Sequence, residues 1–107
     1  MLDLFLKHRD VILAETPGVL CLFRNGDYYE AFEDDARKIC RVIGLTLTTK
    51  DNAAGDAIAM CGFPYHALDG YLNKLISDGH RVAICEQVKD AQAAKAFPAR
   101  EVTKTIR

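Results

Sequence analysis

Several features that would assign a chain to a large functional class are missing from this sequence. No apolar run approaches the roughly 18–20 residues of a membrane-spanning helix, and no charged segment followed by an apolar stretch opens the chain as a secretion signal would. It has no G-x-x-x-x-G-K-[ST] phosphate loop and no G-x-G-x-x-G fingerprint. With 107 residues it holds one domain and no nucleotide-driven motor on the same polypeptide. These absences predict a small cytoplasmic protein that does not bind membranes.

The sequence also lacks an excess of basic residues. It has 14 Lys and Arg against 15 Asp and Glu, a formal net charge of −1. A protein that binds nucleic acid by itself usually carries a basic stripe, because counterion release from phosphates supplies most of its non-specific affinity. Any contact with nucleic acid is therefore expected to be local. Residues 27–35 are acidic, and the basic surplus lies in residues 89–107.

The cysteines do not form a recognisable metal or redox motif. The four, which are Cys21, Cys40, Cys61 and Cys85, include no C-x-x-C pair, and no histidine lies at a zinc-ligand interval from them. Each lies in an apolar run, which predicts buried free thiols that pack as small hydrophobic side chains, as is usual in a reducing compartment. A disulfide or a metal set is the alternative.

The pattern of apolar residues predicts an alternation of strands and helices. Helical spacing marks residues 2–14 and 68–76, and a third helix is expected from an Asp34 or Asp35 cap to Ile43, with Gly44 ending it. Strands are expected at residues 19–23, 28–32, 45–49, 57–62, 81–88 and 101–106, and residues 91–96 are a possible helical turn.

The connections complete this prediction. Asn25-Gly26 has the composition of a hairpin turn between the first two strands, and residues 50–56 read as a polar loop. We therefore expect one α/β or mixed α+β domain, in which a mixed sheet of about six strands is flanked by three or four helices.

One constellation combines an aromatic ring with a carboxylate. If residues 28–32 form a strand, Tyr28, Glu30 and Phe32 share one face and Tyr29 lies on the other. One interpretation is an aromatic hairpin with a solvated Glu30. The other is an aromatic wedge with an acceptor beside it, because an aromatic side chain that enters a base step kinks the duplex and a mispaired step unstacks more easily.

Three other groups point less clearly to chemistry. His66 follows a proline near a helix start and is read as a packing or capping residue rather than a ligand. Glu86 and Lys89 resemble the E-x-K of metal-dependent nucleases, but the spacing is one residue too long and places them on opposite faces of a strand. The acidic residues 33–35 favour the N-terminus of the following helix.

Four runs, taken in order, resemble the opening domain of MutS-type DNA mismatch repair proteins. They are L-F-R-N-G-D-Y-Y-E-A-F-E-D-D-A at 22–36, I-G-L-T-L-T at 43–48, M-C-G-F-P-Y-H at 60–66 and V-A-I-C-E-Q-V at 82–88. The similarity covers roughly residues 4–107. It implies that residues 1–107 form a mismatch-recognition domain of the MutS domain I type, with a mixed sheet and flanking helices.

The resemblance also implies roles for individual residues. In the family, a G-D-F-Y-E motif supplies a Phe that enters from the minor groove beside a mispaired or unpaired base, and a Glu that hydrogen-bonds that base. These positions correspond to Tyr28 and Glu30. Tyr28 departs from the family pattern, and its hydroxyl in a base stack would cost about 1–3 kcal/mol without a partner. Lys50 and Met60 match further DNA-contacting positions more loosely, Lys50 as a phosphate contact.

The remaining implications concern the whole protein. The family's connector, lever, clamp and ATPase domains are not in this sequence, so the chain is expected not to be an enzyme by itself and to need no cofactor, since ATP and Mg²⁺ belong to those domains. Its expected partners are double-stranded DNA with a mismatch or small loop, and the rest of a MutS-type protein or a dimer partner. Both a cut-out domain and a stand-alone relative fit the sequence. The alternative function is a protein-interaction or regulatory module that keeps the fold without binding mismatches.

Overall fold

A mixed six-stranded sheet with helices on both faces forms the protein, as seen in a computed structural model that describes residues 2–86 and 102–106. The strand order is β3-β4-β2-β1-β5-β6. β1 and β5 are parallel, and the other neighbouring pairs are antiparallel. The strands are β1 (Leu20–Asn25), β2 (Tyr28–Phe32), β3 (Thr48–Asp51), β4 (Ala57–Pro64), β5 (Val82–Cys85) and β6 (Val102–Ile106). The predicted mixed α+β class and strand number are confirmed in the described residues.

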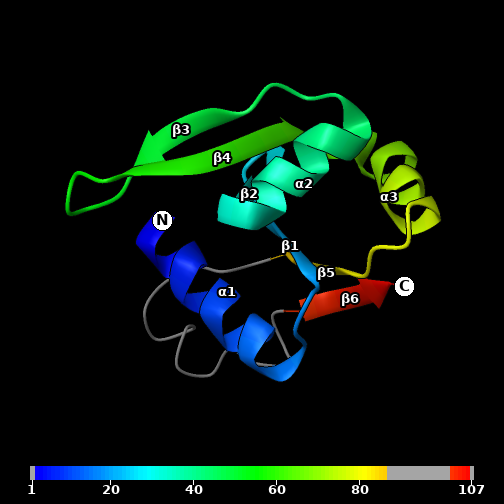
Figure 1. Cartoon of the computed structure of the whole chain (residues 1–107), viewed down its shortest axis with the longest axis horizontal. Coiled ribbons are helices and arrows are strands. Elements are labelled where there is room, and N and C mark those ends of the chain that lie inside the picture. The colour runs from blue at the N-terminus through cyan, green and yellow to red at the C-terminus, as the bar shows by residue number, and fades with distance from the viewer. Residues whose placement is uncertain (1, 87–101, 107) are drawn as a thin grey trace.

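The helices cover the sheet unequally. One face carries α1 (Leu2–Glu15), and the other carries α2 (Glu33–Ile43) and α3 (Leu68–Ser77), the last preceded by a single 3₁₀ turn, η1 (Tyr65–Ala67) (Figure 1). Each helix buries one side against the strands: Phe5 and Ile12 in α1, Ala36 and Ile39 in α2, and Leu72 and Leu75 in α3. No helix in the described part of the chain is long and apolar enough to cross a bilayer.

Strand alternation divides the core into two apolar layers. The layer under α2 and α3 includes Leu22, Tyr29 and Leu75. The layer under α1 is built around three rings, because Phe5 of the helix stacks on Phe23 with centroids 5.0 Å apart and Phe32 lies beside both. The prediction that Tyr28, Glu30 and Phe32 share a face is confirmed, and that face is the α1 side.

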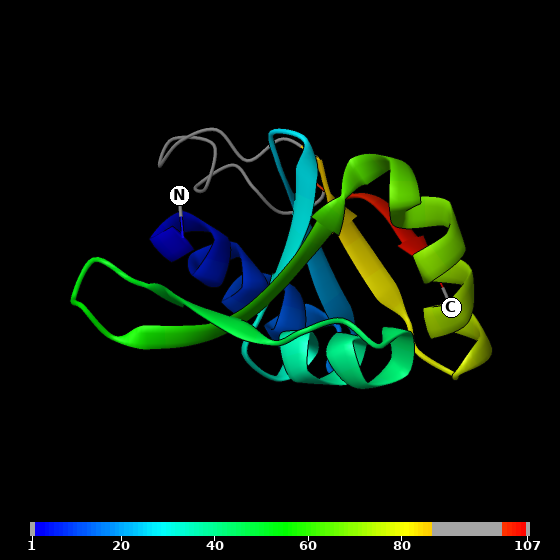
Figure 2. The same ribbon diagram turned by 90° about the horizontal axis from the view of Figure 1, so that it is seen from above.

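Beyond the sheet centre, β3 and β4 continue as a long hairpin that projects past the N-terminal end of α1 (Figure 2). Its loop is attached to that helix, since the backbone N–H of Ala53 donates to Asp3 Oδ2 at 3.0 Å. Gly55 takes the positive φ (+88°) that closes the loop. The hairpin places β3 one strand away from β2, with β4 between them.

Some predicted boundaries are wrong. The third strand begins at Thr48, not at residue 45, so Lys50 lies in β3 rather than in a loop. The first hairpin turns at Gly26-Asp27, because Asn25 pairs with Tyr28, and only Gly26 of the turn has a positive φ. The cap expected from Asp34 or Asp35 is also wrong: the N-cap position of α2 is Phe32, without a side-chain cap.

Asp35 has a different role, which explains the missing cap. Its Oδ2 accepts from Arg9 Nε at 2.9 Å and from the Cys21 N–H at 3.3 Å, so the carboxylate joins α1, α2 and β1. The end of α2 is as expected, with Gly44 at φ +89° and its N–H donating to the Cys40 carbonyl. β5 ends at Cys85, and residues 87–88 and the possible turn at 91–96 lie outside the described residues.

Candidate functional site

The exit of the β1–β2 hairpin presents Tyr28 to solvent. It is the first residue of β2, directly after the Gly26-Asp27 turn, and half of its surface (50%) is exposed although its neighbours on the strand are buried. A large aromatic side chain in such a position buries little area and contributes little to folding. Its ring is therefore available for contact with another molecule.

Glu30 lies two residues further on the same face and is only 9% exposed. A buried carboxylate needs partners. Oε1 of Glu30 accepts from Asn25 Nδ2 at 3.3 Å and from Lys50 Nζ at 3.4 Å. Since β4 lies between β3 and β2, the Lys50 side chain spans a whole strand to reach it.

Gly62 leaves space for the side chains of Tyr28 and Glu30. It pairs with Glu30 across the β2–β4 ladder, and a Cβ on it would lie 3.3 Å from the Tyr29 carbonyl oxygen, 3.7 Å from Glu30 Cγ and 3.9 Å from Tyr28 Cδ2. A side chain there would crowd both residues. The absence of a side chain at Gly62 leaves the strip between Tyr28 and Lys50 open.

Of the four candidate residues, three lie close together and the fourth, Met60, is partly buried. Tyr28 and Glu30 of β2 and Lys50 of β3 all lie on the α1 side of the sheet, and β4 separates the two strands. Met60 is on the same side, but it pairs with Phe32 and packs partly buried against the apolar layer under α1. The arrangement offers an exposed ring, an acceptor beside it and one ammonium group.

Asn25 and Gly62 were not among the residues selected from the sequence. Asn25 was interpreted only as a turn residue, and the signal that could have found it is period-two alternation, which places residue 25 on the face of Phe23. Gly62 sits in a strand interior, a position at which glycine often marks a close approach. Neither signal specifies a hydrogen bond.

A second cluster of contacts stabilises the β1–β2 hairpin from its other face. Arg24 Nε donates to the Gly26 carbonyl at 2.6 Å, and its guanidinium lies 4.4 Å from the ring centroid of Tyr65. The Tyr29 hydroxyl donates to Glu86 Oε2 at 2.6 Å, and burial, followed by this hydrogen bond, raises the pKa of Tyr29. These contacts fix the turn from which Tyr28 projects.

The remaining candidates from the sequence are accounted for locally. Glu86 lies 3.7 Å from Arg24 Nη1 in addition to accepting from Tyr29, so its carboxylate serves the hairpin, while Lys89 lies outside the described residues. His66 is exposed in η1 with its ring edge-on to Tyr65. Within residues 2–86 and 102–106, no three His, Cys, Asp or Glu side chains are placed to hold a metal ion.

The thiols behave as expected for packing residues. Cys21, Cys61 and Cys85 are buried, Cys40 is partly exposed, and none is in a disulfide. Burial raises the pKa of Cys61 to about 12, and it raises that of Cys21 as well. Both thiols therefore stay protonated and poorly nucleophilic at neutral pH.

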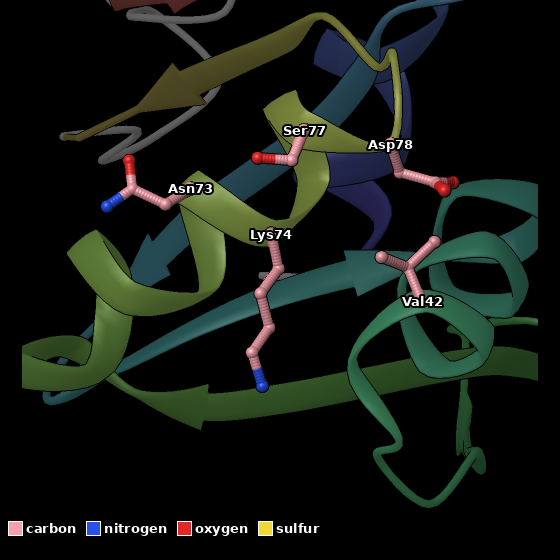
Figure 3. A pocket seen from close by; sticks show the side chains of 5 residues that line it. All are labelled: Val42, Asn73, Lys74, Ser77 and Asp78. Atoms are coloured by element: carbon pink, nitrogen blue, oxygen red, sulfur yellow. The ribbon is translucent and has the colours of Figure 1, made fainter.

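A hollow between α2 and α3 lies on the opposite side of the sheet from Tyr28 and Glu30 (Figure 3). It is lined by Val42, Asn73, Lys74, Ser77 and Asp78. These polar side chains are exposed, and the hollow is open to solvent. It is separate from the candidate site.

Comparison with known proteins gives one consistent result. The family model described as MutS domain I matches residues 7–107. The chain is 47% identical over 95 residues to "DNA mismatch repair protein MutS" of Desulfitobacterium hafniense (strain Y51), covering 89% of this chain and 11% of that protein. It is 45% identical over 101 residues to the protein of the same name from Solibacter usitatus (strain Ellin6076), covering 94% and 12%. The chain is 56% identical over 75 residues to the protein of that name from Salinibacter ruber (strain DSM 13855 / M31), a match that covers 70% of this chain and 8% of that protein. The chain thus spans about a tenth of the length of these relatives.

Proposed function

The chain belongs to the MutS domain I family, and from this membership and the geometry of Tyr28 and Glu30 we propose that it senses mismatched or unpaired bases in double-stranded DNA, as the recognition module of a mismatch repair protein. The observation that carries the proposal is the half-exposed Tyr28 ring beside the carboxylate of Glu30 on one face of the sheet.

The proposed mechanism is intercalation from the minor groove. Tyr28 enters a weakened base step, where its ring replaces part of the lost base stacking, and Glu30 accepts a hydrogen bond from the displaced base. A paired step resists the wedge because unstacking costs a few kcal/mol, whereas a mispaired step has already lost part of that energy. Discrimination then depends on local weakness of the duplex rather than on sequence.

Lys50 and Met60 have supporting roles in this proposal. The ammonium of Lys50, with 38% of its side chain exposed, lies on the DNA-facing side beside Glu30 and approaches the phosphate backbone. Met60 supports the surface proposed to face the minor groove of DNA, because it packs on the apolar layer under α1. We propose no catalytic step and no cofactor for these residues, and we propose a cytoplasmic location for the protein.

The test compares heteroduplex and homoduplex DNA. Short duplexes that differ by one mismatch are titrated into the isotope-labelled chain and followed by NMR, which measures weak binding. We expect tighter binding of the mismatched duplex, with the largest shifts at Tyr28 and Gly62, and loss of the preference in Tyr28→Ala. Leu47→Ala, which shortens an exposed apolar side chain outside the β1–β2 hairpin, serves as the control and should keep the preference.

The alternative is an interaction module that has kept the fold without mismatch binding. The net charge of −1 favours it, since phosphate contacts supply most of the affinity of DNA-binding proteins. Equal binding of both duplexes, or none, with Tyr28→Ala changing nothing both in the chain alone and when it is tethered to a DNA clamp, would establish this alternative.

A further inference from the structure

Tyr28 stands at the end of both strand ladders that hold β2. Its pair with Asn25 is the last of the β1–β2 ladder, and its pair with Pro64 is the last of the β2–β4 ladder. Beyond it the chain turns through Gly26, which takes a φ of +61° and restricts the backbone little. A ring that is half exposed adds little packing of its own. The direction of Tyr28 therefore depends on what holds the turn.

Arg24 holds the turn from the face opposite to Tyr28. Leu22 belongs to the layer under α2 and α3, and Arg24, two residues further along β1, lies on the same side. Its Nε donates to the Gly26 carbonyl at 2.6 Å, and its Nη1 lies 3.7 Å from Glu86 Oε1, just after β5. One side chain thus connects the turn to the end of a neighbouring strand.

Tyr65 holds the other residue of the turn. Its backbone N–H donates to the Asp27 carbonyl at 2.8 Å, one position beyond the last pair of the β2–β4 ladder. The carbonyls of Gly26 and Asp27 are therefore both engaged. The Arg24 guanidinium lies 4.4 Å from the centroid of the Tyr65 ring, at cation–π distance, so the two contacts support each other.

We infer that Arg24, together with the ring of Tyr65, is a positioning residue that fixes the Gly26-Asp27 turn in the conformation from which Tyr28 enters a mispaired step. This inference rests on the proposed function and deepens it. A ring that is already directed outwards loses less conformational freedom on insertion. If only a fraction of the molecules held the turn correctly, the apparent Kd would rise in proportion.

The placement of Arg24 distinguishes this role from a phosphate contact. Its charge is paired with Glu86, and it lies on the side of the sheet opposite to Tyr28 and Glu30. A phosphate contact would contribute to the binding of every duplex, and its loss would reduce the salt dependence of binding by about one counterion. A positioning residue contributes only where the ring is inserted, so its loss affects mismatched DNA alone.

The experiment titrates mismatched and matched duplexes into the chain and into Arg24→Met and Arg24→Lys, at several salt concentrations. Arg24→Met should weaken binding of the mismatched duplex ~3–10-fold, as expected if a third to a tenth of the molecules keep the competent turn. Affinity for the matched duplex and the salt dependence should not change. Arg24→Lys should lose as much as Arg24→Met, because lysine keeps the charge but lacks the planar guanidinium.

The control is Arg37→Met, which removes an exposed arginine whose ion pair lies within α2, and it should leave both affinities unchanged. Far-ultraviolet circular dichroism and thermal melts show whether each variant is folded. Equal weakening of both duplexes by Arg24→Met, or recovery of binding in Arg24→Lys, would identify a phosphate contact and overturn the positioning role.

Two substitutions test the contribution of Tyr65. Tyr65→Phe keeps the ring over the guanidinium and the backbone N–H, and should retain the preference for mismatched DNA. Tyr65→Leu keeps the N–H but removes the ring, and should lower the preference. An unchanged preference in Tyr65→Leu would show that the ring is not needed and would overturn its part in the inference.

A measurement without DNA separates the inference from the function on which it rests. In ¹⁵N relaxation, the amides of Gly26 and Tyr28 should be as ordered as the strands in the unsubstituted chain and more mobile in Arg24→Met, but not in Arg37→Met. If mismatched DNA is preferred and Arg24→Met changes neither the mobility nor the ratio of affinities, the positioning role is wrong and the proposed function stands. If the unsubstituted chain binds both duplexes equally, the proposed function is wrong and the inference fails with it.

Discussion

The Nε of Arg9 lies 2.9 Å from Oδ2 of Asp35, and this one ion pair connects the helix on one face of the sheet to the helix on the other. Both side chains are nearly buried, and the same oxygen also accepts from the Cys21 N–H. Loss of one partner would leave the other as an uncompensated buried charge. The pair therefore matters more for stability than its exposed counterpart, Arg37 with Asp34.

Replacement of Arg9 by Met should destabilise the protein by about 3–5 kcal/mol at neutral pH. Arg37→Met is the matched control and should cost about 0.5 kcal/mol or less, because the Arg37–Asp34 pair is exposed and only three residues apart in one helix. Urea denaturation gives both values. A cost for Arg9→Met within 0.5 kcal/mol of the control would contradict the structural role of the pair.

The cost of Arg9→Met should depend on pH. Burial raises the pKa of Asp35 above its ordinary value of 3.8 even with Arg9 present, and the Arg9 hydrogen bond and charge oppose that shift. Without Arg9 the pKa rises further. The folded state then binds a proton that the unfolded state releases, so stability falls as pH rises through the raised pKa and is regained as pH falls towards 3.8. The difference in unfolding free energy between Arg9→Met and the parent should shrink on acidification, and a growing difference would contradict it.

Gly62→Ala should be destabilising although alanine is a small residue. The added Cβ would lie 3.3 Å from the Tyr29 carbonyl oxygen, which is fixed in the β2–β4 ladder and can move little. We expect a loss of about 1–3 kcal/mol, typical of overpacking. Gly70→Ala is the control, because nothing lies within 4 Å of its Cβ in α3, and it should stabilise by about 0.5–1 kcal/mol. A neutral or stabilising Gly62→Ala would show that the strip beside Tyr28 is looser than the contacts imply.

Most of the strands and helices could be predicted from the sequence because their signals are local. Apolar spacing marked the helix with Leu72 and Leu75, and alternation placed Tyr28 and Glu30 on one face. The errors arose where a distant partner decides the outcome. Asp35 has the residue type of a helix cap, but its partner Arg9 is 26 positions away, and nothing local indicates it.

The candidate site shows the same limit. Tyr28 and Glu30 could be selected from their spacing, yet the contact between Glu30 and Lys50 spans 20 positions and depends on β4 lying between their strands. A polar run such as residues 50–56 gives no information on which strand will neighbour it. The hydrogen bonds that orient the carboxylate therefore became visible only with the sheet order.

The buried thiols should resist alkylation in the folded protein. A raised pKa, about 12 for Cys61, leaves almost no thiolate at pH near 8, and burial excludes the reagent. Iodoacetamide labelling followed by peptide mass spectrometry should modify the partly exposed Cys40 first. Cys21 and Cys61 should react only at the rate of unfolding, and equal early labelling of Cys40 and Cys61 would contradict their burial.

Tyr28→Phe should increase the preference for mismatched DNA. The phenol hydroxyl loses its water in a base stack, which costs about 1–3 kcal/mol unless a partner is found, whereas a phenyl ring stacks equally well. Because Tyr28 is half exposed, the substitution should leave folding stability within about 0.5 kcal/mol. Titration of both duplexes measures the ratio. A lower ratio in Tyr28→Phe would mean that the hydroxyl itself makes a favourable contact with DNA.

Salt should separate the wedge from the backbone contacts. With a net charge of −1, the chain alone is expected to bind duplex DNA with a Kd no tighter than ~10⁻⁴–10⁻⁶ M at physiological salt, and added salt should weaken binding further by competing for the phosphates. Stacking of Tyr28 and the weakness of a mispaired step involve no counterions, so the ratio of mismatched to matched affinity should stay constant as salt rises. Titrations at several salt concentrations test both statements. A ratio of mismatched to matched affinity that falls with salt would show that discrimination depends on charge rather than on the aromatic wedge. Submicromolar binding by the chain alone would show that it has a local basic surface despite its net charge of −1.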